Sequence, residues 1–249
     1  MSSEQELIRH PDGASLASDV GERTIAAIKE AQAQGRDAHI SLTGGRGGTS
    51  GLEAVLASPD CGSVNWGRVV FWWSDERFLP EGDPQRNETG AREALLDHVA
   101  VDPGKVHPMP RLDGPAGDDL DAASASYAAV LKAEAEPGND IPLFDVCILG
   151  VGEDAHVASL FPGRTEMNEP QSVVSVRNSP KPPPLRTTFT LRVILNSRQV
   201  WLIASGAGKA DAVKLATSGL PAEEAPAGAA RGIEKTLFFI DKDAGAKID

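Results

Sequence analysis

FDVCILGVGEDAHVASLFPG, residues 144–163, is the segment that decides how the fold of this chain is interpreted. Its apolar run at 146–149 is typical of a strand buried on both faces of a parallel sheet. Two glycines end the run, and Asp154 and His156 follow. Ligands of open α/β sheets bind beyond the carboxyl ends of strands, so a histidine beside carboxylates here is a candidate base. From this segment alone, a polar loop with a capping histidine is an equal alternative.

A second strand is predicted at residues 39–42, and it runs into TGGRGGTS at 43–50, with a helix following through residue 56. A glycine-rich turn between a strand and a helix points backbone N–H groups at an anion, and glycine permits close approach and positive φ. Thr43, Gly44, Gly45 and Arg46 are therefore candidate phosphate ligands. A merely flexible loop is the alternative. The segment is not a Walker loop, because no Gly-Lys-Ser/Thr ends it.

A third strand, RVVFWW at residues 68–73, ends in Ser-Asp-Glu-Arg. These charges are either a solvated turn or a further part of the site. If this strand neighbours the strand at 39–42, Arg77 lies beside Arg46, with Asp75 close by.

The remaining pattern alternates helices and strands. Helices are expected at 15–34, 87–99 and 120–135, strands at 172–176, 186–191, 199–204 and 236–240, and a linker at 108–117. A helix also opens after SGAGKA at 205–210, which places Lys209 at its N-terminus. The helix macrodipole disfavours a cation there, and a bound anion would offset this. The order of elements predicts an α/β fold with a mainly parallel sheet.

The composition excludes several classes of partner. The chain has 249 residues and a net charge of -12, so a general attraction to nucleic acid or anionic membranes is not expected. No apolar run approaches the ~20 residues that span a bilayer, and the N-terminus lacks the apolar core of a signal peptide. Cys61 and Cys147 make no disulfide framework. A cytoplasmic protein is expected.

Three other chemistries fit the sequence less well. GVGEDA at 150–155 has dinucleotide-binding spacing, but Pro162 and Gly163 leave little room for the helix that should follow. The histidines are not paired at metal-ligand spacing, and no G-x-S-x-G elbow is present. His156 is then the best-placed base, with Arg46, Arg77 and Lys209 as converging cations. This set predicts hydrolysis or proton transfer on a small phosphorylated molecule.

Over nearly its full length, the chain resembles the 6-phosphogluconolactonase family. The resemblance rests on five blocks in order: SLTGG at 41–45, WWSDERFLP at 72–80 with NETGAREALL at 87–96, the opening segment at 144–163, SPKPPPLRTT at 179–188, and SGAGKADAV at 205–213. It implies a Rossmann-like three-layer sandwich, with a mainly parallel central sheet flanked by helices, of the NagB/RpiA/CoA transferase-like type. It also implies a single lactonase domain over 1–249.

The resemblance further implies roles for the candidate residues. His156 is similar to the family's general base, which activates water against C1 of 6-phospho-D-glucono-1,5-lactone, and Asp154 is expected to orient it. Asp75 would fix Arg77 or a sugar hydroxyl. The implied substrate-binding residues are Thr43, Gly44, Gly45, Arg46, Asp75, Arg77, Gly152 and Lys209. No metal or cofactor is implied, and the expected state is a monomer, with a weak dimer as the alternative.

Two positions depart from the family pattern. Arg46-Gly47-Gly48 stands where Ser-Thr-Pro is usual, and Ala155 replaces the usual glycine before the histidine. If that position needs φ > 0, alanine costs about 1 kcal/mol there. A glucosamine-6-phosphate deaminase is the closest rival activity, although SLFP after the histidine is the lactonase form. A non-catalytic sugar-phosphate-binding module is the third possibility.

Overall fold

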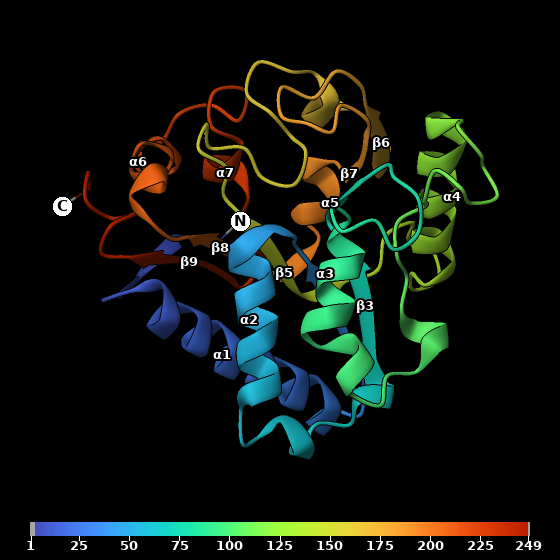
Figure 1. Ribbon diagram of the computed structural model, residues 1–249, viewed down its shortest axis with the longest axis horizontal. Coiled ribbons are helices and arrows are strands. Elements are labelled where there is room, and N and C mark those ends of the chain that lie inside the picture. Colours follow the sequence, from blue (N-terminus) through green and yellow to red (C-terminus); the bar gives the residue numbers. More distant parts are fainter. Residues whose placement is uncertain (1–2, 249) are drawn as a thin grey trace.

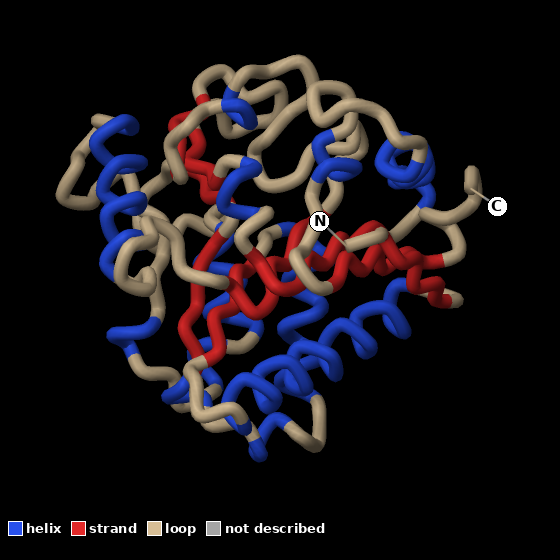
Figure 2. Tube along the Cα trace, turned by 180° about the vertical axis from the view of Figure 1, so that it is seen from behind, coloured by secondary structure: helices blue, strands red, loops and turns tan. Residues whose placement is uncertain are grey.

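A computed structural model describes residues 3–248 of the chain. Its centre is a sheet of six strands that all run parallel. The strands are β1 (Gln5–His10), β2 (Ala38–Leu42), β3 (Val69–Trp73), β5 (Phe144–Gly150), β8 (Ser197–Ala204) and β9 (Lys235–Asp241). Their order across the sheet is β1-β9-β8-β5-β2-β3. Figure 2 shows them as a band across the middle of the molecule.

The central strands are buried along nearly their whole length. β3 is buried at all five of its residues, and β5 at all but its last. Asp145 is the charged exception in β5. Its carboxylate accepts from the His39 backbone N–H and pairs with Arg36 at 2.9 Å. The apolar runs that predicted buried strands therefore lie in the core, and the buried charge of Asp145 is compensated.

Two helices cover one face of this sheet, α1 (Gly13–Ala33) and α2 (Gly45–Ala57) (Figure 1). Glycines allow the close packing between them: a Cβ on Gly21 would lie 2.9 Å from the Val55 backbone N. α3 (Asn87–Ala94) packs beside α2. Because α2 and α3 start at the carboxyl ends of strands, this packing sets the positions of their first residues.

The other layer is more irregular (Figure 2). It holds a small antiparallel sheet in the order β4-β7-β6 and four helices. These elements are β4 (Asp75–Arg77), β6 (Val173–Val176), β7 (Arg186–Phe189), α4 (Leu120–Ala133), α5 (Leu191–Ile194), α6 (Ala210–Thr217) and α7 (Pro226–Ala229). β4 starts two residues after β3 ends, so the small sheet begins at the rim of the large one.

The predicted architecture, a mainly parallel central sheet flanked by helices, is confirmed. Two strands, β1 and β4, and the short helices α5 and α7 were not predicted. β1 lies at the sheet edge, and its polar sequence QELIRH carries little apolar signal. Residues 75–77 are a short strand rather than a turn, because they pair with Arg186–Thr188 across the small sheet. The division into a single domain over 1–249 stays a prediction.

Candidate active site

One cleft of ≈ 940 Å³ lies at the carboxyl ends of the central strands. Thr43 follows β2, Asp75 follows β3, Gly152 follows β5 and Ser205 follows β8, and all four line the cleft. The other predicted site residues that line it are Gly44, Gly45, Arg46, Arg77, His156 and Lys209. Asp154 is the exception, since it contacts His156 without lining the cleft. The sheet thus brings together residues from four separate parts of the sequence.

His156 is placed by a tight loop that follows β5. The Ala155 N–H donates to the Gly152 carbonyl at 3.0 Å, and the Gly152 N–H donates to the His156 carbonyl at 2.9 Å. Ala155 has φ 63°, the positive value for which glycine is favoured, and it is fully buried. Its carbonyl accepts from the Ala227 N–H at 2.9 Å, which ties the loop to α7. Ala155, which departs from the family pattern, therefore adopts the positive φ expected of the glycine that it replaces.

The His156 ring is fixed on three sides. Its Nδ1 lies 2.5 Å from Asp154 Oδ1, its centroid lies 4.5 Å from that of Phe161, and a Cβ on Gly152 would lie 2.0 Å from the ring. The side chain of His156 is 14% exposed. Because Nδ1 is occupied by Asp154, Nε2 is the nitrogen left to exchange a proton with a ligand in the cleft.

Asp154 is held in its ionised form. Burial raises its pKa, but the hydrogen bond from His156, the charge of His156 and the charge of Lys181 together bring the pKa well below its usual range. Lys181 Nζ lies 3.7 Å from Asp154 Oδ1. An ionised Asp154 accepts from Nδ1–H, which fixes the tautomer in which Nε2 is the basic atom.

The predicted glycine-rich loop is mostly helix. α2 begins at Gly45, with Gly44 as its N-cap, so only Thr43 and Gly44 separate it from β2. Gly45 has φ 74°, and a Cβ on Gly48 would lie 2.3 Å from the Thr43 carbonyl O. The glycines are thus required by backbone conformation and close packing rather than by flexibility. The helix N-terminus still directs its free N–H groups at the cleft.

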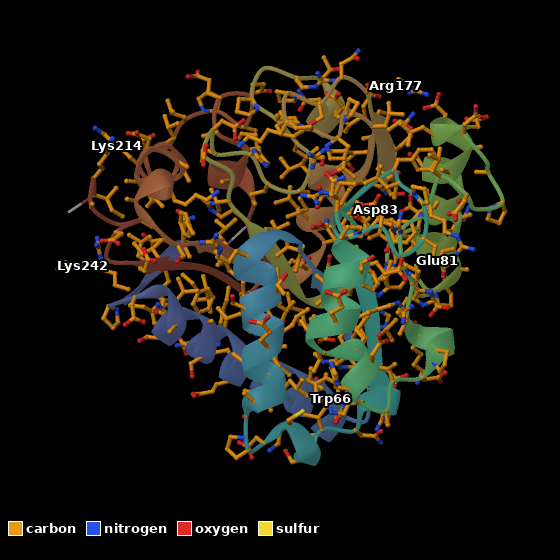
Figure 3. The ribbon with its side chains drawn as sticks, in the orientation of Figure 1. Trp66, Glu81, Asp83, Arg177, Lys214 and Lys242 are labelled. Atoms are coloured by element: carbon orange, nitrogen blue, oxygen red, sulfur yellow. The ribbon has the colours of Figure 1, made fainter. Side chains whose placement is uncertain are left out.

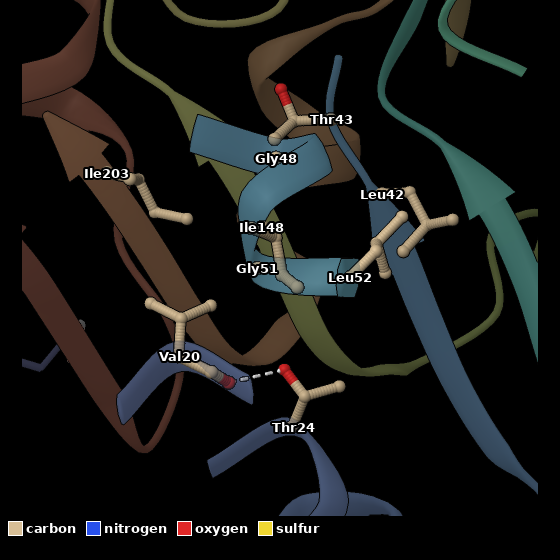
Figure 4. Close-up of a pocket in the computed structure, with 9 residues that line it drawn as sticks. All are labelled: Val20, Thr24, Leu42, Thr43, Gly48, Gly51, Leu52, Ile148 and Ile203. Atoms are coloured by element: carbon tan, nitrogen blue, oxygen red, sulfur yellow. Dashed lines mark hydrogen bonds between the residues drawn. The ribbon is translucent and has the colours of Figure 1, made fainter. Parts of the chain in front are cut away.

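Beneath these first turns of α2 lies a separate small cavity of ≈ 10 Å³ (Figure 4). Mostly apolar side chains line it, including Leu42, Ile148 and Ile203, and Thr24 turns its hydroxyl to the Val20 carbonyl at 2.7 Å. Its volume holds about one water at most, so it is a packing defect and not a substrate site.

The predicted cations reach the cleft from different elements. Arg77 Nη1 donates to the Gln85 carbonyl at 2.5 Å, while its Nε is buried without a hydrogen-bond partner among residues 3–248. Lys209 is the N-cap of α6. Burial lowers the pKa of Lys209 and the charge of Lys181 lowers it further, whereas Glu153 opposes this. A bound anion would favour the charged form of Lys209.

Asp75 does not pair with Arg77 as one of the expectations had it. Its Oδ2 accepts from the Ser159 hydroxyl at 2.7 Å and lies 3.8 Å from Arg186 Nη1. Its Oδ1 accepts from Asn87 Nδ2 at 3.3 Å. The antiparallel pairing of β4 with β7 places Arg186 near Asp75, and that pairing was not predicted.

Among the lining residues that the sequence interpretation missed are Asn87, Lys181 and Arg186. Arg186 is 4% exposed and donates to the carbonyls of Lys181, Pro182 and Pro183. It therefore holds the loop that carries Lys181 toward Asp154. All three lie in sequence blocks that carry the family resemblance, but the residue types alone do not tell which side chains point into the cleft.

No group of three or more His, Cys, Asp or Glu side chains within 3–248 is placed to hold a metal ion. None of the helices in that range is long and apolar enough to cross a bilayer. Among the basic residues labelled in Figure 3, Arg177 lies on the opposite side of the molecule from Lys214 and Lys242.

Known proteins resemble this chain over nearly its full length. Residues 11–239 match the family described as glucosamine-6-phosphate isomerases/6-phosphogluconolactonase. A 6-phosphogluconolactonase of Streptomyces coelicolor is 46% identical, with 100% of this chain and 96% of that protein covered. One of Mycobacterium tuberculosis is 45% identical, covering 100% and 99%.

Solved structures share the fold. The crystal structure of a 6-phosphogluconolactonase from Thermotoga maritima has a TM-score of 0.82 at 26% identity and covers 96% of this chain and 100% of that one. A monomeric glucosamine-6-phosphate deaminase has a TM-score of 0.80 at 19% identity, covering 97% and 99%. The second similarity, at this low identity, concerns the fold alone.

Proposed function

Because the chain belongs to the family of glucosamine-6-phosphate isomerases and 6-phosphogluconolactonases, we propose that it hydrolyses 6-phospho-D-glucono-1,5-lactone to 6-phospho-D-gluconate in the oxidative pentose phosphate pathway. The observation that carries the proposal is the His156–Asp154 pair, which leaves Nε2 as the available base beside the cleft. Relatives of 45–46% identity over the full chain bear the lactonase name.

In this proposal His156 acts twice. Nε2 takes a proton from a water molecule as its oxygen bonds to C1 of the lactone, and the carbonyl becomes a tetrahedral oxyanion. When the oxyanion collapses, the bond between C1 and the ring oxygen breaks, and Nε2 returns the proton to that oxygen. Asp154 stabilises the imidazolium formed between the two steps. General-base assistance is worth typically 10²–10⁴-fold, so alignment of the water with C1 supplies part of the remaining acceleration.

The phosphate of the substrate is proposed to lie among the cations. Arg46, Arg77 and Lys209 line the cleft from three elements, and the N–H groups at Gly44 and Gly45 face the same space. The Nε of Arg77 is buried without a hydrogen-bond partner among residues 3–248, and an anionic ligand would offset the burial that lowers the pKa of Lys209. Holding the phosphate fixes the distant lactone carbonyl relative to His156.

The test is to generate the lactone in situ and follow acid release. His156→Ala should lower kcat by at least 10²-fold. The matched control is His98→Ala, because His98 is exposed and its Nε2–H donates to the Glu93 carbonyl at 2.9 Å, away from the cleft. Near-wild-type turnover by His156→Ala would dismiss the proposed base. Ammonia release from glucosamine 6-phosphate would instead identify a deaminase, and tight 6-phosphogluconate binding without catalysis would identify a binding module.

The proposal includes a single cytoplasmic domain over 1–249 that works as a monomer, with a weak dimer as the alternative. Its partner is the small-molecule lactone rather than nucleic acid or a membrane, in keeping with a net charge of -12. Light scattering across a range of protein concentrations would detect a dimer.

A further inference from the structure

The carboxylate of Glu76 covers the N-terminus of α3. It is fully buried, and its Oε1 accepts from the backbone N–H groups of Arg77 at 2.8 Å and Asn87 at 2.7 Å. Its Oε2 accepts from the Glu88 N–H at 2.9 Å. Asn87 and Glu88 are the first two residues of α3, so Glu76 caps this helix from β4. This cap fixes the position of the Asn87 backbone, from which the side chain extends.

The side chain of Asn87 joins two segments of the cleft. Its Nδ2 donates to the Asp75 carbonyl at 2.8 Å and to Asp75 Oδ1 at 3.3 Å. Its Oδ1 lies so close to Gly44 that a Cβ there would be 1.7 Å away. Asn87 therefore fills the space beside the N-cap of α2 while it holds the carboxylate that follows β3.

The chain of contacts continues to the histidine loop. The other oxygen of Asp75 accepts from the Ser159 hydroxyl, and the Ser159 N–H donates to Thr188 Oγ1 at 3.1 Å. Ser159 lies three residues after His156. Asn87 thus lies between the proposed phosphate end of the cleft and the segment that carries the base.

We propose that Asn87 is a positioning residue that fixes the Gly44 turn and Asp75 relative to one another, and so sets the site for the phosphorylated substrate. This inference rests on the proposed function. Nδ2 restrains Asp75, and the bulk of the amide keeps the Gly44 turn from relaxing toward α3. Loss of the amide mainly weakens substrate binding, because His156 keeps its own contacts with Asp154 and Phe161.

The first experiment measures kcat and KM of Asn87→Ala. KM should rise about tenfold, as expected for a lost buried hydrogen-bond network, while kcat falls by less. Asn87→Asp keeps the shape but loses the donor and adds a charge beside Asp75, so it should bind no better than Asn87→Ala. Asn87→Ser, which is too short to reach Asp75, provides the same measurement if the alanine variant does not fold.

The matched control is Asp119→Ala. Asp119 caps α4 by accepting from the N–H groups of Asp121 and Ala122, and it does not line the cleft. Its loss should lower the unfolding midpoint and leave KM unchanged. If Asn87→Ala also lowers the midpoint but leaves KM within twofold of wild type, Asn87 is only structural and the inference is overturned.

A double-mutant cycle tests the contact with Gly44. Gly44→Ala alone places its methyl group against Asn87 Oδ1, whereas Gly44→Ala in the Asn87→Ala background has room for it. The double variant should therefore have a lower KM than Gly44→Ala alone. Additive effects would contradict the proposed contact.

Failure of this inference is distinguishable from failure of the proposed function. Calorimetric binding of 6-phosphogluconate by Asn87→Ala does not depend on turnover, while His156→Ala reports on the chemistry. Weakened binding in Asn87→Ala together with normal turnover by His156→Ala would support the positioning role and reject the proposed base. Unchanged binding in Asn87→Ala together with loss of turnover in His156→Ala would reject the positioning role and support the proposed base.

Discussion

Gly152 and the imidazole of His156 are packed so closely that a Cβ on Gly152 would lie 2.0 Å from the ring atoms Cε1 and Nδ1. Gly152 is needed for this contact rather than for its backbone angles, because its φ is not positive. This close approach lets the His156 imidazole pack against the backbone of Gly152.

Gly152→Ala should therefore lower kcat by at least 10²-fold, because the methyl group forces His156 away from Asp154. Circular dichroism should show a folded protein, since the nearest atoms to the added methyl group belong to the His156 ring rather than to the core. Gly62→Ala is the control, because a Cβ there would meet nothing within 4 Å. Normal turnover by Gly152→Ala would mean that the observed ring position is not the reactive one.

Asp154→Asn should lower kcat about 10–100-fold by removing the acceptor that fixes the histidine tautomer. Stability should change with pH as well. The folded-state pKa of Asp154 lies below its ordinary value of 3.8, so the carboxylate contributes stability above pH 3.8 that is lost as pH falls through the folded pKa. Urea unfolding between pH 5 and pH 3 should show a steeper loss for wild type than for Asp154→Asn. An equal pH dependence of the unfolding free energy in the two proteins would contradict the proposed contribution of the Asp154 carboxylate.

Lys181→Met should raise the pKa of the Asp154 carboxyl. Lys181 Nζ is 3.7 Å from Asp154 Oδ1, and its positive charge is one of the causes that hold this pKa below its ordinary value. Lys181 is 38% exposed, so solvent screening keeps the effect small. Lys214→Met on α6 is the control and should leave the pKa of Asp154 in place. NMR titration of the Asp154 carboxyl measures both variants, and an unchanged or lower pKa in Lys181→Met would refute the proposed electrostatic role.

Arg186→Lys should destabilise the fold by about 2–3 kcal/mol and raise KM. The lysine cannot satisfy the carbonyls of Lys181, Pro182 and Pro183 together, so the loop bearing Lys181 is released. Arg192→Lys is the control, because Arg192 is 47% exposed and pairs with the exposed Asp140 at 2.7 Å. Denaturant unfolding and steady-state kinetics measure the two effects, and a neutral Arg186→Lys would contradict them.

Ala155→Gly should be close to neutral. Relief of the positive φ favours glycine by about 1 kcal/mol, while loss of a fully buried methyl group costs about 0.8 kcal/mol. Ala155→Val should be strongly destabilising, because a β-branched residue is disfavoured at φ 63°. Thermal unfolding of both variants checks the balance. A stable Ala155→Val would show that the loop can leave its observed conformation.

Much of the fold could be predicted because its buried strands are continuous apolar runs. The segment at 146–149 predicted the core of β5, and the alternation of elements predicted a parallel sheet. β1 could not be found in this way, since an edge strand buries little apolar surface and its pairing with β9 spans most of the chain. Nor could β4, whose three polar residues are a strand only because β7 lies beside them.

The residues of the candidate site likewise divide into those that the sequence could predict and those that it could not. His156, Asp75 and Lys209 could be placed from the ends of predicted strands. Asn87 and Arg186 could not, because their positions depend on contacts between distant segments. The glycines after Thr43 were assigned to a loop, whereas α2 already begins at Gly45, because Gly48 and Gly51 pack against Thr43 and Val20. Helix propensity alone would exclude them.

The pairing of β1 with β9 also bears on how the protein is made. In the sheet β1 lies at the edge, and its one neighbour there among residues 3–248 is β9, which forms from residues 235–241. During synthesis on a ribosome, β1 cannot pair until residues 235–241 have been translated. The nascent chain therefore carries β1 unpaired over this interval, and slowing the ribosome between the codons of the two strands should prolong its exposure to chaperones and proteases.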